Sequence, residues 1–382
     1  MTLENKNLNV PPLRFPEFKG EWTCYEFGKI ANNTCEKYNP CKNEHKEDIE
    51  LDSLESDLGI CTHFYDSSSQ NSIKNVYTKN SILYGKLRPY LNKWYLPEKD
   101  GVCSSEIWVI SSKVLERVFL YSLIQSKTFS DGANTSSGSK MPRADWDFVK
   151  KIRINVPEKS EQTKIGKLIL SLERRIEVQR KIIEDLRIVK ENIVNCFFDS
   201  EDCLLSTYLR ETSNRLDNND DYDVYSVSNS KGFNKQSEQF DGKTIASKDK
   251  SKYKVVKKLE FAYNPARINV GSIAINKLSH PLIVSPMYIT FCTNKSINPF
   301  YLEYYFKSNS FKNQMKGFLE GSVRQCLQFS NLSKMMIKKT DLKQQEVFSR
   351  KMKKLDKLSN LETKALNCLN LLKSYLLKNM FI

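Results

Sequence analysis

The fold is decided by residues 161–198, which read EQTKIGKLILSLERRIEVQRKIIEDLRIVKENIVNCFF. Apolar residues recur in this stretch at alternating intervals of four and three, and only Gln179 and Lys190 interrupt them. The apolar positions are Ile165, Ile169, Leu172, Ile176, Ile183, Leu186, Ile193 and Phe197. The stretch has no proline, and its only glycine is Gly166. The pattern predicts one long helix, roughly 55 Å at 1.5 Å per residue, that packs lengthwise against another long helix.

The same pattern returns 183 residues later, between Gln345 and Phe381, where Lys373 repeats the polar position of Lys190. The matching apolar positions are Phe348, Met352, Leu355, Leu366, Leu369, Leu376 and Met380. Seven-residue patterns are common, so the helices alone leave open the alternative of two unrelated amphipathic helices. Taken as partners, they predict a helix pair that packs through these apolar positions.

The similarity between the two halves continues upstream of the helices. Residues 81–91 match residues 260–270, which aligns Tyr84 with Tyr263 and Arg88 with Arg267. Three further pairs of segments match in the same order, namely 103–110 with 283–291, 120–129 with 302–311, and 138–154 with 321–337. The offset drifts only from 179 to 183, and a repeat of this length predicts a duplicated domain.

The duplication predicts four parts. They are a globular domain at 1–157, a long helix at 158–198, a second globular domain at 199–340 and a second long helix at 341–382. Copies of one unit tend to be related by an approximate twofold axis, which would pack the helices antiparallel and hold the two domains apart. We therefore expect an α/β (α+β) fold with a pseudo-twofold internal repeat, in which an antiparallel coiled coil separates two similar globular domains.

The protein is strongly basic, which favours a polyanionic partner. The chain has 382 residues, a net charge of +15 and a pI near 9.2, which suit two or three domains and nucleic-acid binding. No apolar run approaches a membrane span and the N-terminus lacks an apolar signal segment, so we expect a cytoplasmic protein without a membrane partner. The ten cysteines form no CxxC pair and are expected as free thiols, and no zinc template fits them, so no metal is expected.

The sequence offers no recognisable active site, so no catalytic residue is predicted. Residues 264–267 (NPAR) come nearest to the adenine-methyltransferase motif, but they lack the second proline and the aromatic residue that would hold a flipped base. The phosphate-binding pattern G-x-x-x-x-G-K-[ST] is absent, and GANTSSGSK at 132–140 has the wrong spacing for it. A divergent methyltransferase or nuclease site is an alternative, as is a scaffold whose basic loops hold acidic proteins.

Basic and amide side chains occur in loops at matching places of the two halves. Arginine can read guanine, Asn and Gln can read adenine, and lysine suits phosphates. The candidate DNA-binding residues are Lys86, Arg88, Lys93, Lys140, Arg143, Arg267, Lys277, Arg324 and Gln325. For each of them the competing interpretation is a solvated surface side chain that reads nothing. The aromatic residues of the matched strands are expected in the cores, and they are Tyr84, Trp108, Tyr263 and Tyr288.

Four stretches together resemble the specificity subunit of type I restriction–modification enzymes. They are LRFPEFKGEW (13–22), ILYGKLRPYL (82–91), YNPARINVGSIA (263–274) and VPEKSEQTKIG (156–166). The resemblance covers nearly the whole chain, and the order of the pieces matches the family. One departure is that Gln344 and Gln345 stand where the first half has Glu161 and Gln162, so the second helix is expected to start with a different cap or angle.

The resemblance implies two target-recognition domains that each read one half of a bipartite site in double-stranded DNA. It implies that the helix pair sets the spacing between them and docks two methyltransferase subunits, with restriction subunits further out. The family's subunit has no activity of its own, so endonuclease and adenine-methylation activity would arise only in the complex. No cofactor is then expected in this chain, and S-adenosylmethionine, ATP and Mg would act through the partner subunits.

Overall fold

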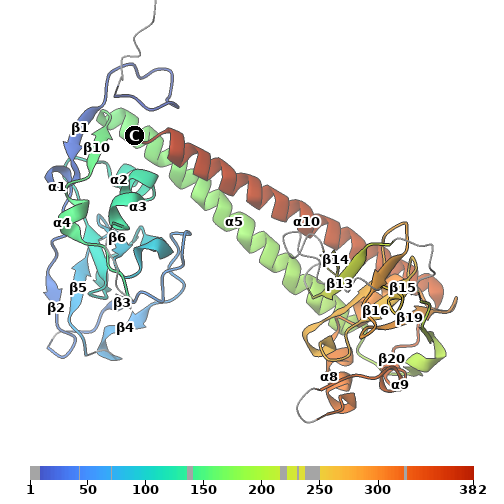
Figure 1. Ribbon diagram of the computed structural model, residues 1–382. Coiled ribbons are helices and arrows are strands. Elements are labelled where there is room, and N and C mark those ends of the chain that lie inside the picture. The colour runs from blue at the N-terminus through green and yellow to red at the C-terminus, as the bar shows by residue number, and fades with distance from the viewer. Residues whose placement is uncertain are drawn as a thin grey trace, which may run out of the picture. The chain divides into compact units, whose positions relative to one another are not determined.

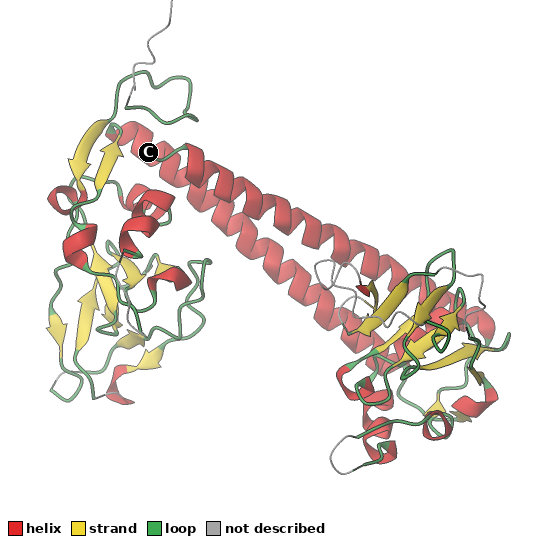
Figure 2. Ribbon diagram, in the orientation of Figure 1, coloured by secondary structure: helices red, strands yellow, loops and turns green. Residues whose placement is uncertain are grey.

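The computed structural model describes residues 9–42, 44–69, 71–135, 141–215, 222–229, 232–236, 250–321 and 325–382. The chain divides into two compact units, the first made of residues 1–181 with 363–382 and the second of residues 182–362. Helices and strands are mixed in both units (Figure 2). Over the described ranges, no helix combines the length and the apolar character needed to cross a membrane.

The long helix predicted from the opening stretch is confirmed. Helix α5 spans Lys159–Phe197, and helix α10 spans Leu342–Asn379 (Figure 1). Pro157 lies just before α5, where a proline does not interrupt helical hydrogen bonds. The side chain of Asp341 caps α10 by accepting a hydrogen bond from the Gln344 amide at 2.9 Å. In both cases the local sequence sets where the helix begins.

Each unit joins a part of α5 to a part of α10. In the first unit, the start of α5 shares a buried cluster with the end of α10. That cluster contains Ile165, Ile169, Leu172, Ile176, Leu376, Met380 and Phe381, with Leu366 and Leu369 at its edge. In the second unit, Val194 at the end of α5 and Phe198 just after it pack with Phe348 and Met352 at the start of α10, with Phe197 and Leu355 at the edge. Apart from Ile193, the predicted seam residues therefore lie in the cores of their units or at the core edges, and Ile183 and Leu186 are half-buried.

The prediction for Ile193 is wrong. Its side chain is 40% exposed, whereas the neighbouring Val194 is 3% exposed and packs in the core. A straight α-helix has 3.6 residues per turn and drifts away from a strict seven-residue repeat. Toward the end of α5 the inward face therefore moves by one residue and follows Lys190, Val194 and Phe198 at intervals of four.

We call the strands and short helices before α5 the first head. Its strands are β1 (Thr23–Glu26), β2 (Lys37–Tyr38), β3 (Glu47–Ile49), β4 (Tyr65–Asp66), β5 (Lys74–Tyr77), β6 (Ile82–Gly85), β7 (Trp94–Tyr95), β8 (Gly101–Cys103), β9 (Ile107–Ile110) and β10 (Arg153–Val156). They form sheets in the orders β1-β10, β2-β5-β8-β3-β4 and β7-β6-β9. Its helices are α1 (Phe27–Ile30), α2 (Arg117–Leu123), α3 (Lys127–Ala133) and α4 (Trp146–Val149).

The segment between α5 and α10 is the second head. Its strands are β11 (Cys203–Leu204), β12 (Leu209–Thr212), β13 (Val224–Ser228), β14 (Gly232–Lys235), β15 (Lys254–Val256), β16 (Phe261–Tyr263), β17 (Ile273–Ile275), β18 (Leu282–Val284), β19 (Ile289–Thr293) and β20 (Met336–Ile337). The sheet orders are β11-β20, β12-β19-β16-β17 and β14-β13-β18-β15. The helices are α7 (Pro299–Tyr305), α8 (Asn309–Phe318) and α9 (Phe329–Leu332).

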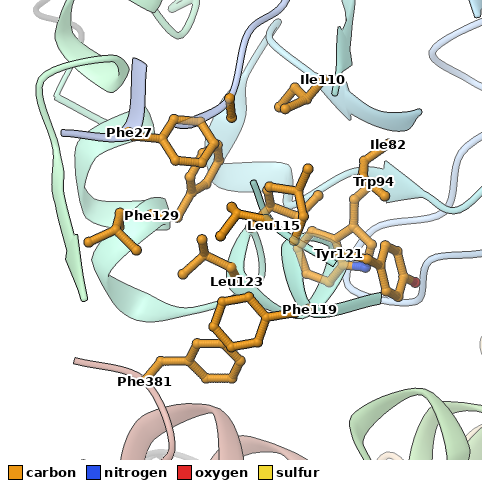
Figure 3. Close-up of a cluster of buried hydrophobic side chains, with 14 of the residues drawn as sticks. Phe27, Ile82, Trp94, Ile110, Leu115, Phe119, Tyr121, Leu123, Phe129 and Phe381 are labelled. Carbon is orange, nitrogen blue, oxygen red and sulfur yellow. The ribbon is translucent and has the colours of Figure 1, made fainter. Parts of the chain in front are cut away.

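The aromatic strand residues lie in the cores, as predicted. Tyr84, Trp108, Tyr263 and Tyr288 are all buried. In the first head, the core packs against the helix pair through α2, where the ring of Phe119 lies 5.4 Å from that of Phe381 (Figure 3). In the second head, α7 takes this place, and the ring of Tyr301 lies 4.9 Å from that of Phe198. Each head is thus held to the helices by aromatic contacts of one short helix.

An N-terminal arm explains why the two long helices start differently. Arg14 donates two hydrogen bonds of 2.7 Å to the carboxylate of Glu161, which is fully buried, and the indole of Trp22 donates a third at 3.2 Å. The Leu13 amide also donates to the Asn379 carbonyl at 3.0 Å. The position equivalent to Glu161 in α10 is Gln344, which is exposed. The start of α5 therefore carries a buried carboxylate because Arg14 pairs with it, whereas the start of α10 has an uncharged, exposed glutamine at the same position.

Candidate nucleic-acid interface

In the first head, three of the predicted residues lie on two segments that meet beside β6. The Arg88 amide donates to the Pro142 carbonyl at 2.7 Å, and the Ala144 amide donates to the Lys86 carbonyl at 2.8 Å. Arg88 has a left-handed backbone, with φ of 51°, and Pro89 follows it. This sharp turn exposes the Arg88 side chain, and within the described residues no carboxylate pairs with it.

Arg143 lies on the second of these segments, and its guanidinium is held by Glu106. The Nε–Oε2 distance is 3.0 Å and the Nη2–Oε1 distance is 3.2 Å. This bidentate ion pair raises the pKa of Arg143. Both side chains are accessible to solvent, so the pair contributes little to stability. Its effect is to orient a planar group that suits a base edge or a phosphate.

Two of the three lysines predicted in this head are less accessible than the arginines. The Lys93 ammonium donates to the Leu51 carbonyl at 2.7 Å, and its side chain is half-buried. Lys86 is also half-buried, beside the exposed Arg88. We infer that the lysines shape the loop while Arg88 and Arg143 present its polar groups. Lys140 lies outside the described residues.

The second head repeats this arrangement around Arg267. The Leu327 amide donates to the Pro265 carbonyl at 3.0 Å, so the segment after β16 meets the segment before α9. Arg267 is exposed on the first segment, and Gln325 is exposed on the second. The hydrogen bond is the counterpart of the Ala144–Lys86 bond in the first head.

Lys277 does not join this cluster. It follows β17, whose last residues pair with Phe261 at the start of β16, whereas Arg267 follows the end of β16. Its ammonium lies 2.8 Å from Glu303 on α7. The grouping of Lys277 with Arg267 is therefore wrong, because adjacent antiparallel strands carry successive loops to opposite ends of a sheet. Arg324 lies outside the described residues.

Sequence reasoning missed the exposed apolar side chains beside the arginines. Tyr90, two residues after Arg88, is 56% exposed, and Met141 precedes the segment that meets the Arg88 loop. In the second head, Val270 is 59% exposed three residues after Arg267. Apolar side chains next to arginine suit contacts with thymine methyl groups or insertion between base steps. The sequence signal was available, because an apolar residue follows each arginine closely, Tyr90 two residues after Arg88 and Val270 three residues after Arg267.

The sequence is also similar to proteins of known function. Residues 21–187 match the family model described as Type I restriction modification DNA specificity domain. The chain is 25% identical over 160 residues to the type I restriction enzyme EcoDI specificity subunit of Escherichia coli, covering 41% of this chain and 36% of that protein. It is 24% identical over 190 residues to the HindI specificity subunit of Haemophilus influenzae, covering 47% of this chain and 41% of that protein.

The alignments thus span well under half the length of these two curated relatives. Among solved structures, the chain resembles the S subunit of a type I restriction–modification system from M. genitalium, with a TM-score of 0.59. That match covers 98% of this chain and 99% of the other, at 14% sequence identity. The match supports a fold in common with that S subunit along nearly the whole chain, including the heads and the long helices.

Proposed function

We propose that this chain, which belongs through residues 21–187 to the family of type I restriction modification DNA specificity domains, is the DNA sequence-recognition subunit of a type I restriction–modification complex. The observation that carries the proposal is an exposed arginine at the same place in each head, Arg88 and Arg267. Arginine is the side chain that most often reads a guanine edge. A divergent enzyme and a scaffold for acidic proteins are both less favoured, because the matched family is a DNA specificity domain.

We infer that the two units are copies of one ancestor. A buried glutamine makes the same contacts in each. The side chain of Gln162 accepts from the Glu116 amide at 2.8 Å and donates to the Pro157 carbonyl at 2.9 Å. The side chain of Gln345 accepts from the Asn298 amide at 2.7 Å and donates to the Thr340 carbonyl at 2.8 Å. Both tie a short head helix to the start of a long helix, which favours an antiparallel coiled coil with a pseudo-twofold repeat.

In the proposed mechanism the heads bind specific DNA sequences and the long helices determine the distance between the two bound sequences. Each head contacts one half of a bipartite site in double-stranded DNA, and the coiled coil sets the gap between the halves. The exposed Arg88 and Arg267 would hydrogen-bond base edges, Arg143 would be oriented for a base or phosphate by Glu106, and Gln325 would suit adenine. The chain would contribute no catalytic group of its own.

The helices also offer surfaces for partner subunits. Helix α10 exposes several large apolar side chains along its length, and α5 does the same. Those on α10 are Leu342, Val347, Leu358, Leu361, Leu371, Leu372 and Tyr375, and those on α5 are Leu168, Val178, Ile182, Ile188, Val189 and Ile193. Large apolar side chains exposed to solvent on one element favour an interaction site. We propose that two methyltransferase subunits dock there, with restriction subunits further out, and that these subunits bind S-adenosylmethionine, ATP and Mg.

Exchange of one head tests the proposed function. Replacing residues 199–340 by the corresponding head of a relative with another target should change one half of the methylated sequence and leave the other half intact. The measurement is methylome sequencing of cells that carry the exchanged or the original chain with its methyltransferase subunits. A change of the whole sequence, or of neither half, would contradict the two-head proposal.

Single substitutions should separate the two heads further. Arg88→Gln is expected to weaken recognition of one half-site and Arg267→Gln that of the other, each by about 1–3 kcal/mol, the usual worth of a bidentate base contact. Lys277→Gln is the matched control, because Lys277 is paired to Glu303 away from the loop, and binding should stay unchanged. Binding titrations on DNA that is altered in one half-site at a time give the measurement. Equal losses at both half-sites for either arginine would exclude it as a base reader.

A further inference from the structure

In the first unit, three polar side chains from three elements meet where the head contacts the helices. Glu173 of α5 and Lys373 of α10 form an ion pair of 2.6 Å, and both side chains are nearly buried. Tyr121 of α2 lies close to the same carboxylate, and burial together with the charge of Glu173 raises the pKa of Tyr121 well above its ordinary value. The Lys373 ammonium also lies over the ring of Trp94, 5.6 Å from its centroid. One carboxylate therefore connects the head to both helices.

In the second unit, the same three kinds of side chain meet. Asp356 of α10 pairs with Lys190 of α5, and the Tyr304 hydroxyl of α7 donates to the other Asp356 oxygen at 2.7 Å. Burial acts to raise the pKa of Asp356, but the hydrogen bonds from Lys190 and Tyr304 outweigh it and the pKa lies below its ordinary value. The carboxylate is thus held in its charged form.

The two triads correspond residue by residue. Tyr121 and Tyr304, Glu173 and Asp356, and Lys190 and Lys373 are each 183 residues apart. In each unit one long helix supplies the carboxylate and the other supplies the lysine, and the two helices exchange these roles between the units. Such an exchange is what a twofold repeat requires of a contact that involves both helices.

We propose that these triads, Tyr121–Glu173–Lys373 and Tyr304–Asp356–Lys190, are the brackets that fix the angle between each head and the helix pair and so set the spacing at which the heads read DNA. The proposal rests on the proposed function and adds positioning residues to it. Apart from the hydrogen bonds of Gln162 and Gln345 at the helix starts, the other contacts between head and helices are largely aromatic and aliphatic, and such contacts tolerate sliding. A half-buried ion pair with a shared hydrogen bond is directional, and its energy falls when the geometry changes.

The first test measures the head within its own unit and needs no DNA. Spin labels at the exposed Lys295 of the second head and Lys351 of α10 would report the distance between head and helix in the full chain. Noncanonical amino acids would carry the labels, because the chain has ten cysteines. In Asp356→Asn the distance distribution should broaden. In Asp356→Glu it should stay as narrow as in the original chain, because the first unit uses glutamate at this place.

Two further variants separate positioning from general damage. Tyr304→Phe removes only the hydroxyl and should also broaden the distribution, which keeps the test available where Asp356→Asn folds poorly. Glu184→Gln is the control, because Glu184 is exposed and its charge is paired with Arg187 on the same helix, α5. An unchanged distribution in both Asp356→Asn and Tyr304→Phe would overturn the bracket.

The second test connects the bracket to DNA. The full chain with its methyltransferase subunits would be titrated with its selected site and with sites whose gap is one base pair longer or shorter. In Asp356→Asn, discrimination against the altered gaps should fall about tenfold, which corresponds to ~1.4 kcal/mol, while Glu184→Gln should discriminate like the original chain. Undiminished discrimination in a variant whose distances have broadened would overturn the role in spacing. If the original chain selects no bipartite site, the proposed function fails, and the label distances still decide whether the bracket exists.

Discussion

Gly166→Leu is expected to destabilise the first unit by about 3–5 kcal/mol, because a side chain at this position would collide with backbone. A Cβ built on Gly166 would lie 2.6 Å from the Val118 carbonyl carbon and 2.7 Å from the Phe119 nitrogen. These atoms belong to α2, which the aromatic core holds in place, so they cannot move aside as a flexible side chain could. Relief requires α2 to separate from α5, and that separation would also disrupt the contact of Phe119 with Phe381.

The measurement is denaturant unfolding of the full chain, followed by circular dichroism. Gly317→Leu is the matched control, because Gly317 also lies in a helix, α8, and no atom lies within 4 Å of its built Cβ. That substitution should be neutral or stabilise by up to about 1 kcal/mol, since leucine favours helix more than glycine does. A Gly166→Leu chain as stable as the Gly317→Leu chain would show that the close approach of α2 and α5 does not hold in solution.

The counterpart of Gly166 in α10 shows the same demand for a small residue. It is Ser349, which is buried and whose hydroxyl donates to the Gln345 carbonyl at 2.7 Å. Glycine and serine both allow a short head helix to lie close to a long helix. The sequence contained this signal as an unexplained glycine in an otherwise uninterrupted helix, but a single glycine does not tell which backbone approaches it.

The long helices could be predicted because a repeated apolar spacing is a property of the chain itself. The failure at Ile193 has the same origin, because a straight helix drifts from a strict seven-residue spacing, and near Val194 the inward face has moved round by one residue. The matching of Arg88 with Arg267 came from the repeat and placed both on equivalent loops. Lys277 was misplaced because sequence order does not reveal which end of a sheet a loop occupies.

The polar contacts between distant segments could not be predicted at all. Tyr121 and Lys373 are separated by most of the chain, and each alone is an ordinary residue of its helix. Lys74 is another example, since a lysine at the start of a strand normally extends into solvent. Only the folded chain shows that Lys74 is fully buried, with two carboxylates for its charge.

Lys74→Met is expected to cost about 3–5 kcal/mol at neutral pH, because it leaves buried negative charge without its cation. The Lys74 ammonium lies 2.7 Å from Asp48, which is fully buried, and it also pairs with Glu50. Burial acts to lower the pKa of Lys74, but the two carboxylates outweigh it and the pKa is raised. Methionine fills a similar volume, so the loss measures the missing charge more than a cavity.

The loss of stability in Lys74→Met should depend on pH, and the protonation of Asp48 determines whether it grows or shrinks as the pH rises. Burial raises the pKa of Asp48 above its ordinary value of 3.8, even with Lys74 and its hydrogen bond acting to lower it. A group whose folded pKa is raised contributes stability at low pH and loses it as the pH rises through that pKa. Without Lys74 the pKa of Asp48 should rise further. The deficit of Lys74→Met should therefore be smallest in acid and grow toward neutral pH.

Unfolding at several pH values measures this dependence. Lys127→Met is the matched control, because Lys127 pairs with Asp131 on the surface of α3 and such exposed pairs contribute about 0.3–0.5 kcal/mol. Combining Lys74→Met with Asp48→Asn should recover part of the loss at neutral pH, because the amide carries no charge that needs a partner. A deficit that stays constant with pH, or that Asp48→Asn does not reduce, would mean that the loss comes from packing in the β3–β5–β8 sheet and that the buried charge is not its cause.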